Sequence, residues 1–177
     1  MNILVLKSSP HVHGSSNLLA DAFLLGAKEQ GHQVVEINVA KALVHPCMAC
    51  DVCGMKNPCV QKDDMCEIGE QLMHCDMVVF VTPLYYFGFS AQLKLVIDRF
   101  YSWNERIIEK RFQSVLIAAA WEKEEETMET LKHHYKQLCQ YLCFQDRGMV
   151  LGRGCGTVEM TRQSVFPQQA YRLGKTL

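Results

Sequence analysis

The sequence has 177 residues, enough for one domain whose core needs neither disulfides nor a metal in order to fold. Hydrophobic residues make up 49% and charged residues 21%, with 11 Gly and 5 Pro, and this composition excludes a disordered or collagen-like chain. The net charge of −1, without a basic stripe, argues against nucleic-acid binding and against a strongly acidic carrier that docks through its charge.

Strand and helix patterns alternate along the chain. Short apolar runs predict strands, and apolar residues at i, i+3, i+4 and i+7 predict amphipathic helices. The expected strands are residues 2–8, 33–39, 77–82, 114–120 and 149–151, and the expected helices are residues 18–30, 63–75, 90–100, 122–144 and 167–177. This alternation predicts an α/β domain with a doubly wound parallel sheet and helices on both faces. No repeat or linker divides residues 1–177, so we expect a single domain.

Three features bear on the cellular compartment. The first apolar run, residues 3–6, has no basic flank and is typical of a buried strand rather than a signal peptide. The longest other apolar run, residues 115–121, is too short to cross a bilayer. The nine cysteines are an odd number, which rules out complete internal pairing, and we expect no disulfide framework. We therefore expect a cytoplasmic protein that binds no membrane.

The loop of residues 8–17 follows the first predicted strand and precedes a helix. It combines serine hydroxyls, the Asn17 amide and the flexible Gly14. A helix N-terminus has unpaired N–H groups and a positive dipole end, so it holds a phosphate without requiring a lysine. The glycine patterns of a Walker A loop and of a dinucleotide fingerprint are both absent. The loop therefore predicts either a phosphate site or an ordinary helix cap.

The turn of residues 83–88 follows the third predicted strand and carries Tyr85, Tyr86 and Phe87. Aromatic faces suit a flat ring ligand, and Gly88 permits close approach of the backbone. The alternative is a hydrophobic plug packed inside the domain. Trp121 ends the next strand at the same sheet edge, where it contacts either a ligand or the core. Because ligands of such sheets bind at the carboxyl ends of the strands, both loops are candidate binding segments.

These motifs resemble those of the flavodoxin-like FMN reductases. Ser9-Pro10-His11-x-x-Gly14-Ser15-Ser16-x-x-Leu19 is similar to the Ser-Pro-Arg-x-x-Gly-Asn-Thr-x-x-Leu loop of that family. The more specific likeness lies in Thr82-Pro83-Leu84-Tyr85-Tyr86-Phe87-Gly88, followed by Gln92-Leu93-Lys94 and Ile97-Asp98-Arg99. The segment from Pro46-Cys47 to Asp63-Asp64-Met65 and the end, Ala170-x-x-Leu173-Gly174-Lys175, also match. The resemblance covers nearly the whole chain, with the motifs in the right order.

The resemblance implies a flavodoxin-like sheet of strand order 2-1-3-4-5 and an FMN-dependent oxidoreductase. Electrons would pass from NAD(P)H to a quinone, a flavin or a similar small acceptor, and no catalytic side chain is expected because the chemistry takes place at flavin N5. His11 stands where the family has Arg, which implies weaker or pH-dependent phosphate binding. The residues implied for the FMN phosphate are Ser9, His11, Gly14, Ser15, Ser16 and Asn17, and those implied for its ring are Pro83, Leu84, Tyr85, Tyr86, Phe87, Gly88 and Trp121.

Assembly is also implied by the resemblance, since the family forms dimers or tetramers with the flavin near a subunit interface. We therefore expect a homodimer or homotetramer. The candidate interface is the apolar stretch 93–103, which contains Leu93, Val96, Phe100, Tyr101 and Trp103.

Four cysteines, Cys47, Cys50, Cys53 and Cys59, have the spacing C-x2-C-x2-C-x5-C. Bacterial ferredoxins hold [4Fe–4S] clusters with a similar run, whereas four-cysteine zinc sites usually show two separated pairs. The spacing also resembles that of iron–sulfur flavoproteins, a branch of the same family. A cluster, free or oxidised thiols, and zinc all stay open. The other cysteines, Cys66, Cys75, Cys139, Cys143 and Cys155, are expected to be buried small hydrophobes, while residues 122–126 and the pair His133-His134 are expected to be solvated.

Two further functions stay open beside the reductase. One is an electron carrier with FMN and an iron–sulfur cluster that serves redox protein partners, which the four cysteines favour and the near-zero charge disfavours. The other is a flavin-free binding or regulatory module of the same fold.

Overall fold

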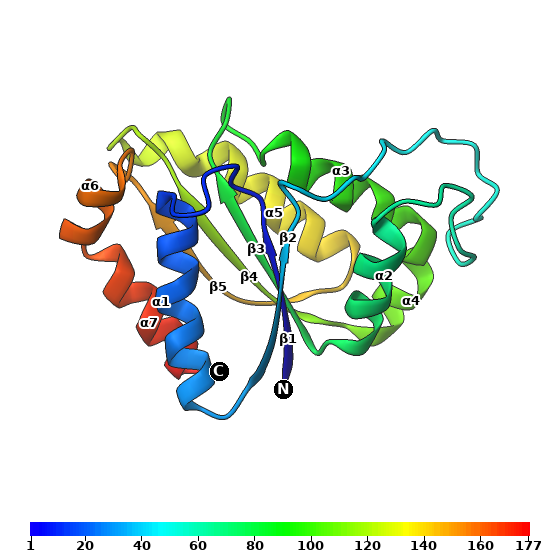
Figure 1. Ribbon diagram of the computed structural model, residues 1–177, viewed down its shortest axis with the longest axis horizontal. Helices are drawn as coiled ribbons and strands as arrows, with labels where there is room; N and C mark the ends of the chain where they lie inside the picture. The colour runs from blue at the N-terminus through cyan, green and yellow to red at the C-terminus, as the bar shows by residue number, and fades with distance from the viewer.

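The computed structural model describes all residues, 1–177, and contains one five-stranded sheet (Figure 1). Its strands pair in the order β2-β1-β3-β4-β5, and every pair is parallel. The predicted fold class and strand order are therefore confirmed. The strands are β1 (Asn2–Lys7), β2 (Gln33–Asn38), β3 (Met77–Pro83), β4 (Gln113–Ala119) and β5 (Gln145–Gly152).

Helices cover both faces of the sheet. One layer comprises α1 (Ser15–Glu29), α6 (Val158–Gln163) and α7 (Phe166–Lys175). The other comprises α2 (Met65–His74), α3 (Ala91–Arg99), α4 (Asn104–Lys110) and α5 (Glu129–Tyr141), with the 3₁₀ helices η1 (Phe100–Trp103) and η2 (Glu125–Met128). In Figure 1 the first layer lies to the left and the second lies behind and to the right. No helix combines the length and the apolar character that a bilayer span requires.

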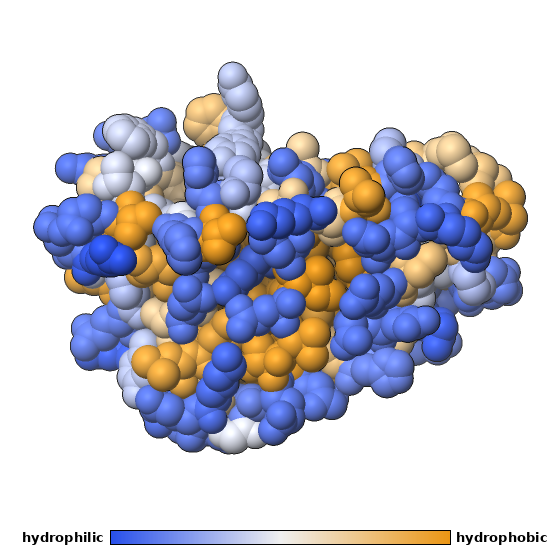
Figure 2. Space-filling view, viewed as in Figure 1, coloured by the Kyte–Doolittle hydropathy of each residue, from blue (hydrophilic) through white to orange (hydrophobic).

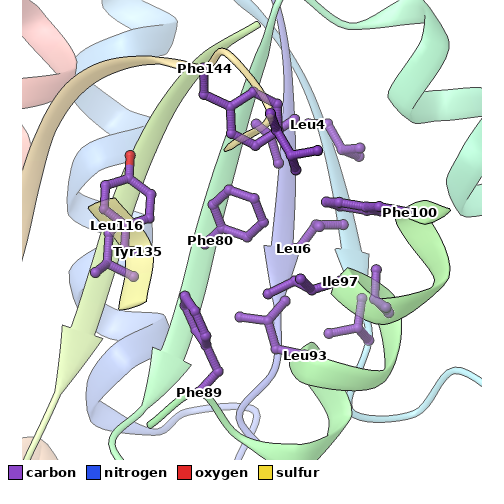
Figure 3. Packing of buried hydrophobic residues seen from close by; sticks show 14 of the residues in the cluster. Leu4, Leu6, Phe80, Phe89, Leu93, Ile97, Phe100, Leu116, Tyr135 and Phe144 are labelled. Atoms are coloured by element: carbon purple, nitrogen blue, oxygen red, sulfur yellow. The ribbon is translucent and has the colours of Figure 1, made fainter. Parts of the chain in front are cut away.

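The apolar runs of the strands explain the two cores. Successive strand residues point to opposite faces, so Leu4 and Leu6 join one core while Ile3 and Val5 join the other. Phe80 of β3 is at the centre of the larger core, with the rings of Phe89, Phe100, Tyr135 and Phe144 centred 6.2–6.4 Å from its own (Figure 3). A sheet buried on both sides needs continuous apolar strands, and residues 77–81 are indeed fully buried.

Several predicted boundaries are wrong. The predicted helix 122–144 is shorter, because residue 124 is extended and the chain enters α5 through the 3₁₀ turn η2. The last strand is longer than residues 149–151, since Gly148 (φ 131°) and a register shift near Ser114 let pairing with β4 begin at Gln145. The helices α4 and α6 and the turn η1 were not predicted.

The predicted interface stretch 93–103 is wrong for most of its residues. Leu93, Val96 and Phe100 are buried in the core of the same chain, so they are not available to a second subunit. The ring of Trp103 packs on α2, where a Cβ added to Gly69 would lie 2.1 Å from it. Tyr101 uses its hydroxyl to donate a hydrogen bond to Asp51 (2.8 Å). The stretch stabilises the fold of the monomer.

Candidate functional site

A cavity of about 600 Å³ lies at the carboxyl ends of β1, β3 and β4. It brings together both loops that sequence analysis singled out. The predicted site residues that line it are Ser9, His11, Gly14, Ser15, Ser16, Pro83, Leu84, Tyr85 and Trp121, whereas Asn17, Tyr86, Phe87 and Gly88 do not line it. Sequence analysis did not single out Val12, His13, Ala119, Ala120 or the turn Cys155, Gly156, Thr157 and Val158, which complete the lining.

The loop before α1 is held in shape by its own side chains. Asn17 is buried and its Nδ2 donates to the carbonyl oxygens of His11 and Val12, both at 3.1 Å. Ser9 Oγ accepts a hydrogen bond from the His11 N–H at 3.3 Å. A Cβ on Gly14 would lie only 3.0 Å from Ser9 Oγ and from the His11 carbonyl oxygen, so this position requires glycine for close packing. Asn17 therefore shapes the loop rather than lining the cavity.

The loop is suited to a phosphate. Gly14 is the N-cap of α1, and no side chain caps the helix there. Ser16 Oγ, a possible donor, is buried without a hydrogen-bond partner and lines the cavity; Asn17 Oδ1, which can only accept, is also unpartnered but lies off the lining. Buried polar atoms normally find partners, and an uncapped helix N-terminus carries free N–H groups and about half a positive charge. The residues present thus fit an anion that accepts hydrogen bonds, and the simple helix-cap alternative does not explain them.

A buried hydroxyl relay joins the loop after β1 to the loop after β3. Ser8 Oγ donates to the Val81 carbonyl oxygen (2.8 Å), and Ser90 Oγ donates to Ser8 Oγ (2.8 Å). The Ser90 N–H donates to Thr82 Oγ1 at 3.0 Å. Ser8, Thr82 and Ser90 have no measurable exposure, so this relay fixes the two candidate binding loops relative to each other.

The aromatic turn is exposed and not packed inside the domain. Its tip projects beyond the end of the sheet at the top of Figure 1, and the space-filling view shows the same projection standing out from the surface (Figure 2). Tyr85 and Gly88 exchange backbone hydrogen bonds (3.3 and 3.1 Å), while Tyr86 and Phe87 between them adopt φ values of 46° and 63°. Such left-handed conformations in bulky residues cost about 1–3 kcal/mol each and concentrate at ligand sites. Tyr86 is fully exposed, so Pro83, Leu84 and Tyr85 form the part of the turn that faces the cavity.

The residues Ala119 to Trp121 form the wall opposite the loop of α1. Trp121 is 64% exposed, an unusual degree for an indole, and it lies against the turn that follows β5. That turn places Gly156 and Thr157 in the lining, and Thr157 also caps α6 by accepting a hydrogen bond from the Met160 N–H (3.2 Å). The only sequence signal for this turn is its run of alternate glycines, Gly152, Gly154 and Gly156.

The cysteine segment forms a long loop at the other end of the molecule, to the right in Figure 1. Arg99 closes its base: Nη1 donates to Asp63 Oδ2 (2.6 Å) and to the His45 carbonyl oxygen (2.8 Å), and Nη2 donates to Asp63 Oδ1 (3.1 Å). The side chains of this ion pair are 1% and 3% exposed. Burial alone would raise the pKa of Asp63, but the hydrogen bonds and charge of Arg99 outweigh it and hold that pKa below its ordinary value.

Asp63 and Asp64 join the start of α2 to the other end of the cysteine segment. Asp64 stands at the N-cap of α2 but its side chain does not cap the helix; its Oδ2 accepts from the Leu43 N–H at 2.8 Å. Asp63 accepts from the backbone N–H groups of His45 (2.9 Å) and Met65 (3.2 Å). Both carboxylates therefore tie the two ends of the cysteine segment together.

The four cysteines do not converge in this arrangement. Cys47 and Cys50 are exposed, Cys53 is buried and Cys59 is half-buried. No three His, Cys, Asp or Glu side chains gather into a group that holds a metal ion. Ala49, Asp51 and Met55 have left-handed backbones, with φ of 52°, 55° and 65°. As arranged, the thiols do not fit a [4Fe–4S] cluster.

The other five cysteines differ in burial. Cys75, Cys139 and Cys155 are buried as predicted, and burial raises the pKa of the Cys75 thiol to about 12, which makes it inert. The prediction of burial is wrong for Cys66 and Cys143, which are exposed. Cys143 lies beyond the end of α5 with φ of 56°, so it does not share a helix face with Cys139.

Residues 122–126 are exposed to solvent, as predicted. The same prediction for the pair His133-His134 is confirmed only for His133. His133 is exposed, while His134 is half-buried with its ring 4.9 Å from that of Phe89. Burial lowers the pKa of His134, the charge of Lys94 lowers it further, and Asp98 opposes both. His134 belongs to no group of three or more His, Cys, Asp or Glu side chains that could hold a metal ion.

Comparison with known families assigns the chain. The sequence profile of the family described as NADPH-dependent FMN reductase matches residues 1–148. The chain belongs to the NADPH-dependent FMN reductase family. This membership confirms the resemblance seen in the loop of α1 and in the aromatic turn, and places the chain in a family of flavin-dependent oxidoreductases.

Curated relatives of this family member carry two kinds of name. An iron–sulfur flavoprotein of Archaeoglobus fulgidus is 30% identical over 106 residues, which cover 60% of this chain and 48% of that protein. An iron–sulfur flavoprotein of Methanosarcina thermophila is 33% identical over 99 residues, covering 56% and 52%. The putative NAD(P)H-dependent FMN-containing oxidoreductase YwqN of Bacillus subtilis is 28% identical over 124 residues, covering 64% and 67%. The chain thus spans about half the length of the iron–sulfur flavoproteins it matches.

Solved structures share the fold. The NAD(P)H:quinone oxidoreductase of Methanothermobacter marburgensis superposes with a TM-score of 0.80 at 17% identity, covering 99% of this chain and 95% of that one. An azoreductase of Bacillus anthracis superposes with a TM-score of 0.73 at 16% identity and covers both chains completely. Because the sequence identities are below 20%, these superpositions establish the flavodoxin-like fold alone.

Proposed function

We propose that the protein is an FMN-dependent oxidoreductase that passes electrons from NAD(P)H to a quinone, a flavin or a similar small acceptor. One observation carries the proposal: a single cavity joins an uncapped helix N-terminus and the unpartnered Ser16 hydroxyl to an exposed aromatic turn. FMN is a molecule with a phosphate at one end and a flat ring at the other. The quinone oxidoreductase and azoreductase names of structural neighbours agree with this class of reaction.

The loop of α1 would hold the phosphate. Ser15, Ser16 and the N–H groups of the first turn of α1 face the cavity, and Ser16 Oγ supplies a hydrogen-bonding atom that is otherwise unpaired. His11 stands where the resemblance implies Arg, and the helix N-terminus beside it supplies a positive dipole end. No lysine or arginine lines the cavity to replace that Arg.

The ring would lie between the aromatic turn and the wall of residues 119–121. Bound FMN supplies two-electron chemistry, accepting a hydride from a reduced nicotinamide and returning two electrons to the acceptor. Pro83, Leu84 and Tyr85 orient the ring, and the backbone of this turn is fixed by the hydroxyl relay. The small side chains of Ala119 and Ala120 leave room for a flat group. No side chain needs to act as acid or base, because hydride transfer itself requires none.

The test is a titration of the protein with FMN and, in parallel, with riboflavin. Hydrogen bonds to a charged group contribute about 1.5–3 kcal/mol each, so loss of two phosphate contacts predicts affinity for riboflavin at least about 100-fold below that for FMN. Equal affinity for the two would overturn the assignment of the phosphate loop. Bleaching of the flavin spectrum by NADPH or NADH without oxygen is expected next, and a stable oxidised spectrum would refute the reductase.

The second candidate is a carrier that combines FMN with a [4Fe–4S] cluster and serves protein partners. The cysteine spacing and the relatives named iron–sulfur flavoprotein favour it, while the scattered thiols of this structure do not. Measuring the iron and acid-labile sulfide content of protein purified without oxygen distinguishes the cluster-containing carrier from the reductase. About four irons per chain would support the carrier, and an iron-free protein that retains flavin would exclude it.

A further inference from the structure

The segment after β4 and the turn after β5 are joined along their backbones. The Ala120 N–H donates to the Gly152 carbonyl oxygen and the Cys155 N–H donates to the Ala120 carbonyl oxygen, both at 2.8 Å. The Gly154 N–H donates to the Glu122 carbonyl oxygen at 2.6 Å. Residues 120–122 are therefore supported by the turn of residues 152–155, at one rim of the cavity.

Two glycines of that turn receive side chains from the facing segment. A Cβ on Gly156 would lie 2.2 Å from Cε3 of Trp121 and 2.5 Å from its Cδ2, so the indole rests directly on the glycine backbone. A Cβ on Gly154 would lie 2.9 Å from Cγ of Lys123, so the lysine stem rests on the second glycine. Trp121 and Lys123, two residues apart, are both held by alternate glycines of one turn.

The two side chains nevertheless keep their functional groups free. The indole is 64% exposed and lines the cavity. Lys123 is exposed and takes part in no ion pair, whereas the neighbouring Arg153 pairs with Glu125 at 3.6 Å. The indole offers a flat apolar face, and the ammonium group of Lys123, which pairs with none of the exposed glutamates at 122 and 124–126, stays available as a donor beside it.

We propose that Trp121 and Lys123 form a docking platform for the electron donor, a nicotinamide dinucleotide, and call this pair the donor platform. The inference rests on the proposed function. A bound FMN would occupy the cavity from the loop of α1 to residues 119–121, so a second substrate reaches it only past the rim. A reduced nicotinamide dinucleotide has flat bases that stack on an indole and phosphates that pair with an ammonium group. An uncharged quinone has no group for Lys123, so the platform distinguishes the donor from a quinone acceptor.

The first test removes the charge in Lys123→Gln, which retains most of the stem over Gly154. An exposed charge contact of this kind predicts a three- to tenfold rise in KM for NADPH or NADH, with kcat and the affinity for FMN unchanged. The rise should shrink with added salt, and Lys123→Arg should restore the KM. Lys136→Gln is the matched control, since Lys136 is also exposed and unpaired but lies within α5.

The second test moves the indole without removing it. Gly156 does not need a left-handed backbone, so Gly156→Ala adds one methyl group where Trp121 now rests and must displace the ring. Gly156→Ala and Trp121→Leu should raise the donor KM by similar factors of about three- to tenfold. Because Trp121 also belongs to the wall beside the ring, both variants are assayed at saturating FMN, and the KM for an uncharged quinone should rise by a smaller factor than the donor KM. Calorimetric titration of FMN-loaded protein with NADP⁺ and NAD⁺ should show the same loss of affinity, independently of turnover.

The outcomes separate this inference from the proposed function. A protein that binds no FMN or oxidises no NAD(P)H refutes the function itself. A working reductase whose donor KM is unchanged in Lys123→Gln and Gly156→Ala refutes the donor platform alone. A rise in the quinone KM instead of the donor KM also overturns it, because the platform would then belong to the acceptor.

Discussion

The ion pair between Asp63 and Arg99 gives the sharpest stability prediction, through the substitution Asp63→Asn. The asparagine keeps one acceptor oxygen for the His45 N–H but turns an NH₂ group toward Arg99 Nη1 or Nη2, which now donate to Asp63 at 2.6 and 3.1 Å. Both side chains are almost completely buried, so the guanidinium would keep its charge without a partner.

The magnitude follows from that burial. Removing one partner of a buried ion pair costs about 3–5 kcal/mol, and the retained hydrogen bond puts the expected loss near the lower value, about 3 kcal/mol. That corresponds to an unfolding constant on the order of 100-fold larger. For a domain of this size, each kcal/mol shifts Tm by about 2–4 °C, so the melting temperature should fall by about 6–12 °C.

Urea denaturation and thermal melting of wild type, Asp63→Asn and Asp64→Asn provide the assay. Asp64 is exposed and accepts a single hydrogen bond from Leu43, so its substitution should cost no more than about 1 kcal/mol. Trypsin should also cleave Asp63→Asn faster at Lys56 and Lys62, since the base of the cysteine segment is released. Equal losses of stability in the two variants would refute the assignment of Arg99 and Asp63 as the clamp.

The same ion pair predicts a pH dependence. The pKa of Asp63 lies below its ordinary value of 3.8 because Arg99 stabilises the carboxylate despite its burial. A carboxylate of lowered pKa contributes its full stabilisation above the unfolded value and loses it as the pH falls through the folded value. The stability gap between wild type and Asp63→Asn should therefore be constant from pH 5 to 7 and close below pH 4.

Three further predictions concern the site and the helix α5. Gly14→Ala would bring a Cβ within 3.0 Å of Ser9 Oγ and the His11 carbonyl oxygen. FMN affinity should therefore fall about tenfold in a fluorescence titration, while the melting temperature changes little. Unchanged affinity would contradict the tight packing. His11→Arg places a permanently charged guanidinium, which can donate two hydrogen bonds to a phosphate, at the cavity. FMN affinity should rise about three- to thirtyfold and depend more steeply on salt. A fall in affinity would show that residue 11 does not face the phosphate. Because burial and Lys94 lower the pKa of His134 against the weaker pull of Asp98, the unfolded chain takes up the proton at a higher pH than the folded chain. The folded state should therefore lose stability as the pH falls from 7 to 5, and His134→Gln should abolish this loss in denaturation curves.

The fold was predictable because the strands carry their own signal. Residues 77–82 read as a strand buried on both faces, and the sheet indeed places helices on either side of β3. The start of the helix predicted at residue 122 was wrong, since a run of glutamates suits both a helical first turn and an exposed extended segment. Local patterns do not distinguish a helical first turn from an extended segment. Backbone hydrogen bonds to the turn after β5 hold this segment extended.

The site was predictable only where side chains signal it. The serines of the loop of α1 and the aromatic turn stand out in the sequence, and both line the cavity. Gly156 contributes by lacking a side chain, and its neighbour in space, Trp121, is 35 residues away. Asp63 is one of two adjacent acids before α2, and nothing in the local sequence indicates its ion pair with Arg99, 36 residues later. Contacts of this range are set by the packing of elements, which no local pattern contains.

The hydroxyl relay through Ser8, Ser90 and Thr82 has a consequence for the thermodynamics of cofactor uptake. The relay already holds the two loops in one arrangement before a ligand binds. A flexible ligand that contacts both loops therefore loses its own conformational freedom on binding, but the loops lose little of theirs. Association then loses little conformational entropy on the protein side, and the loops behave as one rigid template. Replacing Ser90 by alanine would remove the hydroxyl bond to Ser8 but keep the bond from Ser8 to Val81, so the loosened template would show its cost when a ligand must engage both loops at once.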